Sequence, residues 1–186
     1  MFSWMFLALI PYMVQALALA VDEFFCHMRR GLPRWERLGH PLDTLSVLVV
    51  NAVAFFSVFS VTHLGVYVLL ALLSCLFVTK DEWIHARECD AFEQWLHALL
   101  FICHPLTFVS TGFFWVVRDS PALFGFGLQE GSVAAMVLGG QVVVLFAFLL
   151  YQVIYWNFFR PRASHASLQL NPQAMQSKSA DPQSSV

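Results

Sequence analysis

The chain of 186 residues is 59% hydrophobic and only 12% charged, with a mean hydropathy of +0.67. This composition excludes an ordinary soluble domain and indicates an integral membrane protein. Ten Lys and Arg against twelve Asp and Glu give a formal net charge of -2, and Gly-rich phosphate loops are absent from the sequence. We therefore expect no nucleic-acid partner, because such partners require a basic surface.

Apolar segments long enough to cross a bilayer follow one another along the chain. A helix of about 20 apolar residues spans the hydrocarbon core. Five segments qualify, at about 3–21, 42–61, 64–79, 95–117 and 132–158. One helix over 44–79 would reach about 54 Å at 1.5 Å per residue, so we expect a turn near Thr62 to Gly65 instead. The sequence predicts an all-α integral membrane protein with five transmembrane helices.

The distribution of Lys and Arg predicts the orientation of these spans, because short cytoplasmic loops are enriched in both residues. With five spans, nine of the ten basic residues fall on one side and only Arg118 on the other. Four spans would place the arginines of 29–37 opposite Lys80 and Arg87. We therefore predict an N-terminus outside and a C-terminus in the cytoplasm.

The two ends of the chain need separate interpretations. Ala18-Leu19-Ala20 has the form of a signal-peptide cleavage site, but the segment before it lacks a basic region, so we interpret it as the first span. Residues 163–186 are rich in Ser, Gln, Ala and Pro, and we predict that they form a disordered cytoplasmic tail. Residues 1–162 would then form the transmembrane domain.

Two cytoplasmic segments share a pattern of polar residues. The segment 22–29 (DEFFCHMR) matches 81–87 (DEWIHAR) with one deletion, and Glu36-x-x-x-His40 matches Glu93-x-x-x-His97 after another. A competing alignment pairs 40–42 with 104–106 but needs a longer insertion. The repeat predicts two helical hairpins, at about 3–61 and 64–117, inserted in the same orientation. They would form a four-helix bundle, with the span at 132–158 as a fifth helix.

Each of the four repeated helix ends carries a Glu and a His three or four residues apart. Residues at this spacing share a helix face, so we expect the pairs to converge on one centre. Bundles that present Glu and Glu-x-x-His in this way hold two metal ions. His104 lies seven residues beyond His97 and would be a further ligand or a partner of one. The predicted ligands are Glu23, His27, Glu36, His40, Glu82, His85, Glu93, His97 and His104.

Several other polar residues have simpler interpretations. Acids and bases gather at any membrane–water boundary, which explains Arg29 and Arg87 but not histidines at repeated spacing. His104 before Pro105 could instead mark a helix kink. Asn51 is expected to make an interhelical hydrogen bond. Second-choice ligands are Asp22, Asp43 and Asp81; His63 is expected to be interfacial, and Cys26, Cys75, Cys89 and Cys103 to be free thiols.

Carboxylate and imidazole ligands together suit iron, manganese or zinc. We predict two divalent metal ions, with iron preferred, and oxidation, hydroxylation or desaturation of a membrane lipid or other lipophilic molecule, with a redox partner. Di-metal hydrolysis fits the same ligands. A metal-ion transporter, a metal-handling protein and a non-enzymatic assembly factor are the alternatives. The apolar outer half of the spans favours a one-sided site over a transport pathway.

Overall fold

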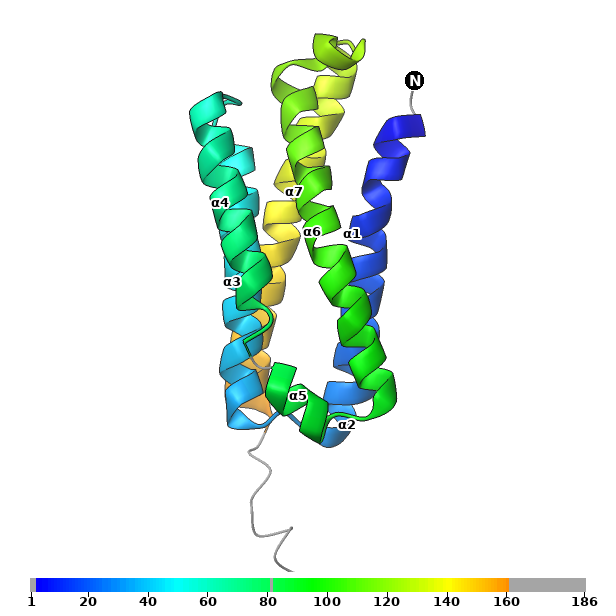
Figure 1. Cartoon of the computed structure of the whole chain (residues 1–186), viewed down its shortest axis with the longest axis vertical. Helices are drawn as coiled ribbons and strands as arrows, with labels where there is room; N and C mark the ends of the chain where they lie inside the picture. The colour runs from blue at the N-terminus through cyan, green and yellow to red at the C-terminus, as the bar shows by residue number, and fades with distance from the viewer. Residues whose placement is uncertain (1–2, 81, 161–186) are drawn as a thin grey trace, which may run out of the picture.

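The computed structural model describes residues 3–80 and 82–160, and every regular element within them is helical. Five long helices run along one axis (Figure 1). They are α1 (Ser3–Val21), α3 (Arg34–Phe56), α4 (Val61–Phe77), α6 (Ala91–Asp119) and α7 (Leu128–Ile154). The short elements are η1 (Asp22–His27) and η3 (Tyr155–Phe159), both π-helical, α2 (Met28–Arg30), α5 (Glu82–Glu88) and the 3-10 turn η2 (Pro121–Phe124). Asp81 and the predicted tail at 163–186 lie outside the described residues.

Four helices are long and apolar enough to cross a membrane, which makes the chain compatible with a multi-pass membrane protein. They are Trp4–His27, Arg34–Phe56, Ala91–Asp119 and Leu128–Phe159. Val61–Phe77 is also apolar but has 17 residues, about 26 Å of helix, at the lower limit for a span. The count of five spans therefore stays a prediction.

The turn between α3 and α4 lies at residues 57–60, so the predicted turn at Thr62 to Gly65 is wrong. Ser60 begins α4, because its hydroxyl accepts a hydrogen bond from the backbone N–H of His63 at 3.2 Å. Gly65 consequently lies inside α4. The start of α4 is therefore set by a serine cap, and the turn at residues 57–60 contains no glycine.

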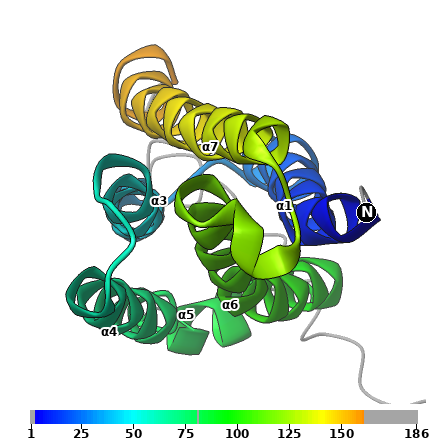
Figure 2. The ribbon, with the colours of Figure 1, turned by 90° about the horizontal axis from the view of Figure 1, so that it is seen from above.

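Helix packing differs from two hairpins with an added fifth helix. Within the described residues, α1 packs along α6, while α3 packs along α7 and α4, and α1 and α3 are not a closely packed pair. Seen from above, α7 lies alongside both α3 and α6 (Figure 2). The last helix is thus part of the central bundle. The proposed duplication of a hairpin stays a prediction.

The short helices α2 and α5 close one end of the bundle, and the N-terminus lies at the other (Figure 1). We call the first the α2/α5 end. Here the chain reverses between α2 and α3 at Gly31, whose φ of +74° favours glycine. Arg118, by contrast, lies near the end of α6 at the opposite end of the bundle. The basic residues at the α2/α5 end include Arg29, Arg34, Lys80, Arg87 and Arg160.

Candidate metal centre

A cluster of carboxylates, imidazoles and one thiol lies inside the α2/α5 end. Three groups of side chains offer donor atoms within 4.8 Å of one another. They are Asp22, His27, Glu93 and His97; His27, Glu36 and His40; and Glu36, His85 and Cys89. Because His27 and Glu36 each belong to two groups, the three form one ligand cluster of eight side chains. All are buried except His40, which is half-buried.

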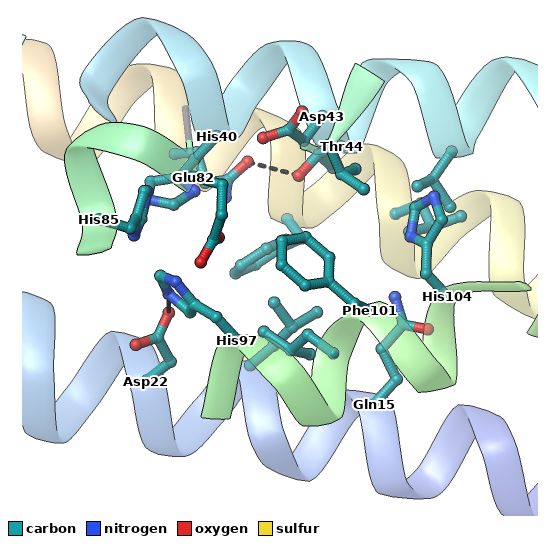
Figure 3. A pocket seen from close by; sticks show the side chains of 17 residues that line it. Gln15, Asp22, His40, Asp43, Thr44, Glu82, His85, His97, Phe101 and His104 are labelled. Atoms are coloured by element: carbon teal, nitrogen blue, oxygen red, sulfur yellow. Dashed lines mark hydrogen bonds and ion pairs between the residues drawn. The ribbon is translucent and has the colours of Figure 1, made fainter. Parts of the chain in front are cut away.

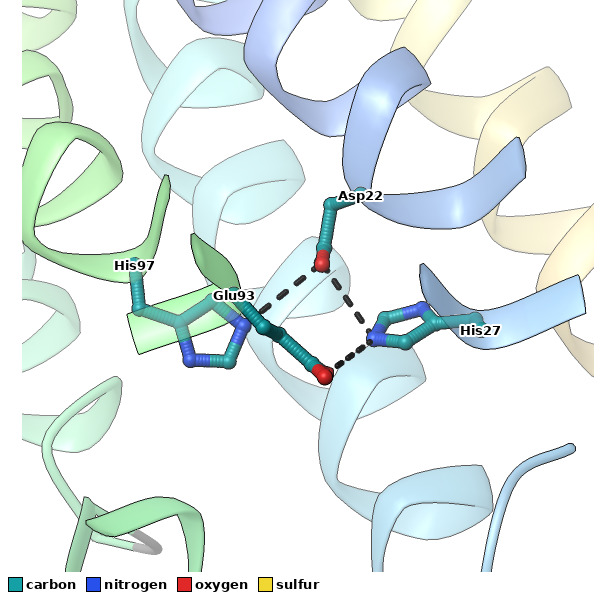
Figure 4. Close-up of side chains that lie close together, drawn as sticks. All are labelled: Asp22, His27, Glu93 and His97. Atoms are coloured by element: carbon teal, nitrogen blue, oxygen red, sulfur yellow. Dashed lines mark ion pairs between the residues drawn. The ribbon is translucent and has the colours of Figure 1, made fainter. Parts of the chain in front are cut away.

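The first group joins η1 to the start of α6 (Figure 4). His27 Nε2 lies 3.3 Å from Asp22 Oδ2 and 3.5 Å from Glu93 Oε1. His97 Nε2 lies 3.6 Å from the same Asp22 oxygen. Ligands that surround a tetrahedral metal at about 2.0–2.2 Å are separated by about 3.3–3.6 Å from one another. Three donor pairs of this group therefore already have the spacing of ligands in a coordination shell, and all four donor atoms lie within 4.8 Å of one another.

The π-helical form of η1 brings Asp22 into this group. In a π-helix the backbone hydrogen bonds join residues five apart, so Asp22 and His27 meet on one face. The sequence interpretation assumed α-helical spacing and therefore selected Glu23, four residues before His27. Asp22, expected only as a second choice, takes the place of Glu23 in the cluster.

Glu23 lies behind His27 instead. Its Oε2 atom is 3.2 Å from His27 Nδ1, and its Oε1 accepts hydrogen bonds from Tyr151 at 2.7 Å and Trp156 at 2.8 Å. A carboxylate that receives the Nδ1 proton of a histidine leaves Nε2 free to bind metal and fixes the orientation of the ring. In His27 it is Nε2 that faces Asp22 and Glu93.

The predicted Glu–His pairs of α3 and α6 both join the cluster. Asp90 caps α6 by accepting a hydrogen bond from the backbone N–H of Glu93 at 2.9 Å, which fixes the first turn. Glu93 and His97, four residues apart, then share one face. On α3, Glu36 is fully buried, and the His40 ring lies 4.8 Å from that of His27, centroid to centroid.

The contribution of α5 is His85 together with Cys89, which follows the helix. The backbone N–H of Cys89 bonds to the carbonyl oxygen of His85 at 2.9 Å and so extends the last turn. This places the Cys89 sulfur 3.5 Å from His85 Nδ1. Cys89 was expected to be an ordinary thiol; its position four residues after His85 was the available signal. Glu82 is outside the three groups and lines the cavity beside them.

A cavity of about 120 Å³ leads from the cluster toward the middle of the bundle. Figure 3 shows His40, His85 and His97 at one end of it, Phe101 between, and His104 with Gln15 at the other end. The ligand cluster therefore borders a space whose lining also includes apolar side chains, namely Leu19, Leu100, Leu145 and Phe148.

His104 is not brought together with the other predicted ligands. Its Nε2 lies 3.1 Å from Ser74 Oγ on α4, which is 2.7 Å from Ser46 Oγ on α3. This chain connects three helices, as a structural polar residue would. Asp43, another second-choice ligand, pairs with Lys80 at 2.7 Å. Asn51 makes the expected interhelical bond and accepts from the Thr111 hydroxyl at 3.0 Å.

Some buried ligand atoms of the cluster lack hydrogen-bond partners among the described residues, and these include Asp22 Oδ1 and His40 Nε2. Burial of a polar atom without a partner costs about 1–3 kcal/mol, and a metal ion would satisfy such atoms. The cluster could therefore hold a metal ion.

No family model, curated protein or solved structure matches this chain.

Proposed function

We propose that the protein binds two divalent metal ions in the ligand cluster and uses them to oxidise a lipophilic molecule of the membrane. The observation that carries the proposal is the position of Glu36. This carboxylate is fully buried and belongs both to the group with His27 and His40 and to the group with His85 and Cys89. A carboxylate shared by two ligand groups is the arrangement by which helical bundles hold two metal ions.

The charges of the cluster also support two ions. Its eight side chains include the carboxylates of Asp22, Glu36 and Glu93 and the thiol of Cys89, all buried. Ionised, they contribute four negative charges, and burial of unpaired charge is strongly unfavourable. Two divalent cations would balance these four charges, whereas a single ion would leave half of them uncompensated.

The ligand types and the surroundings support oxidation of an apolar substrate. Mixed oxygen and nitrogen ligands with one sulfur suit iron, and also zinc or manganese. Two iron ions would supply oxygen activation. The residues of this chain would hold the ions in a buried position, and apolar side chains such as Leu19, Leu100 and Phe101 line the space beside them.

The opposite half of the bundle supports a one-sided site rather than a transport pathway. Ala54, Phe114, Trp115 and Val117 are fully buried there and pack in one apolar core. A pathway for a cation would need polar groups through this region. We place the cluster on the cytoplasmic side, as the distribution of Lys and Arg predicts.

Metal analysis of the purified full chain tests the proposal. We expect about two equivalents of iron, manganese or zinc per chain, and in the iron form a Mössbauer spectrum of two magnetically coupled ions. Glu36→Ala should lose both ions because it removes a ligand from two groups. The matched control is Glu130→Ala, which removes a carboxylate from the opposite end of the bundle and should keep both ions.

Two results would contradict the proposal. One is a wild-type protein that stays metal-free after anaerobic reconstitution with iron, manganese and zinc. The other is equal metal content in Glu36→Ala and wild type.

A further inference from the structure

A second and larger cavity, of about 370 Å³, lies between α1, α3 and α7. Its volume is within the range of small-molecule sites, about 300–1,000 Å³. Phe24 of η1 and Val144 of α7 are lining residues that are themselves exposed on the surface of the bundle. Since this surface belongs to two candidate membrane spans, the cavity opens sideways toward lipid.

This lipid-side cavity adjoins the smaller cavity at the ligand cluster. The two share five lining residues, so a single layer of side chains separates them: Gln15, Leu19, Val47, Leu145 and Phe148. The smaller cavity continues from this layer to His40, His85 and His97. A molecule in the lipid-side cavity would therefore lie beside the space that borders the cluster.

Gln15, in the shared layer, has an unmet hydrogen-bond acceptor. Its Oε1 atom is buried and has no hydrogen-bond partner among the described residues. Two other polar side chains of the cavity are bonded within the protein: the Tyr12 hydroxyl lies 2.6 Å from Thr111 Oγ1, and the Thr107 hydroxyl donates to the His104 carbonyl oxygen at 2.8 Å. A buried acceptor without a donor is costly, so Gln15 favours a ligand with a hydroxyl group.

The charge of the lining excludes an anionic ligand. No Lys or Arg is among the described residues that line either cavity, and Glu23 contributes a carboxylate to the larger one. A fatty-acid carboxylate would enter without a counter-ion, at a large cost in this apolar setting. A neutral hydroxyl needs no counter-ion.

We propose that the lipid-side cavity binds a neutral, membrane-dissolved lipid alcohol, whose hydroxyl donates a hydrogen bond to Gln15 Oε1. The binding site itself stands without metal; only the fate of the bound molecule rests on the proposed oxidation. The alcohol enters between α1 and α7, and its apolar chain lies against Ala16, Ala20 and Val144.

Equilibrium binding of radiolabelled tetradecan-1-ol to the purified full chain in detergent tests this site, with empty micelles as background. Tetradecane, which has no donor, and tetradecanoate, which is anionic, are the matched probes. We expect saturable binding of the alcohol and at least about tenfold weaker binding of both others. Chelator-treated and metal-loaded protein should bind the alcohol alike.

Two variants locate the site. Gln15→Leu should weaken alcohol binding about tenfold, to the level of the alkane, because it removes only the acceptor. Ala20→Phe should abolish binding by filling the cavity, whereas Leu17→Phe, at a 67% exposed position of α1 outside the cavity, should leave it unchanged. Metal content is measured on the same samples and should match wild type in all three.

The proposal is overturned if Gln15→Leu binds the alcohol as wild type does, if Ala20→Phe and Leu17→Phe bind it alike, or if tetradecanoate binds more tightly. Alcohol binding that follows this pattern in a wild type without metal would support the lipid site and refute the metal centre. Metal binding in a wild type that does not bind the alcohol would support the metal centre and refute the lipid site.

Discussion

Both halves of the bundle contain buried side chains, but these are apolar in one half and polar or charged in the other. Near the turn between α3 and α4, the fully buried side chains include those of Ala54, Phe114 and Val117, which need only close packing. At the α2/α5 end, the buried residues need partners for polar or charged atoms; they include Asp22, Glu23, His27, Glu36, His85, Glu93 and His97. Close packing satisfies the apolar half, whereas the proposed metal ions would balance the buried charges of the polar half.

The largest expected effect comes from truncation of a buried side chain in the apolar half. Phe114→Ala should lower the free energy of unfolding by about 3–5 kcal/mol, because Phe114 is fully buried and its loss leaves a cavity. The metal content of the folded fraction should stay at the wild-type value. Denaturant titration followed by circular dichroism measures the first quantity, and metal analysis the second.

Val109→Ala is the matched control, since this residue lies on the same helix but is 70% exposed. If Phe114→Ala lost metal while the protein remained folded, the two halves would not be as independent as their packing indicates.

An intermediate effect is expected from the carboxylate behind His27. Glu23→Gln removes the charge that orients the ring but none of the cluster ligands. Metal affinity should fall about 10- to 100-fold while the number of bound ions stays the same. Tyr151→Phe, which removes one donor to Glu23, should act in the same direction and more weakly. Competition with a chelator of known affinity measures both.

Glu82→Gln provides the control for this change, because Glu82 lines the cavity outside the three ligand groups. Loss of an ion from Glu23→Gln would instead make Glu23 a direct ligand, as the sequence interpretation had it.

The smallest effect is expected at His104. His104→Asn should leave metal binding unchanged, because the imidazole bonds to Ser74 and lies outside the ligand groups. The lost hydrogen bond should lower the free energy of unfolding by about 1 kcal/mol. Denaturant titration and metal analysis of the variant measure these two quantities. Loss of an ion from His104→Asn would show that His104 is a ligand.

The sequence predicts the helices well where composition alone decides them. The first predicted span, 3–21, coincides with α1, and the fourth and fifth lie within α6 and the α7–η3 segment. Helix ends that depend on side-chain hydrogen bonds are harder to predict from composition, as the Ser60 cap shows. The sequence also does not reveal which helices pack against each other, because apolar faces that contact lipid and those that contact a neighbouring helix have the same composition.

Much of the candidate site was predictable for a different reason. The pairs Glu36 with His40 and Glu93 with His97 lie in regular α-helix, where spacing determines the shared face. The choice of Glu23 over Asp22 was not predictable, because no rule of spacing reveals a π-helical segment. Cys89 lies close to the predicted ligands in the sequence, but it was interpreted as a free thiol because a lone thiol is more often inert than ligating.

The π-helical turn of η1 gives two neighbouring acids different partners. In a regular α-helix, successive side chains point about 100° apart, and His27 would share its face with Glu23 rather than with Asp22. Here the wider turn brings Asp22 to the Nε2 atom of His27 while Glu23 stays at Nδ1. One imidazole therefore links a candidate metal ligand on one side to a buried hydrogen-bond network on the other.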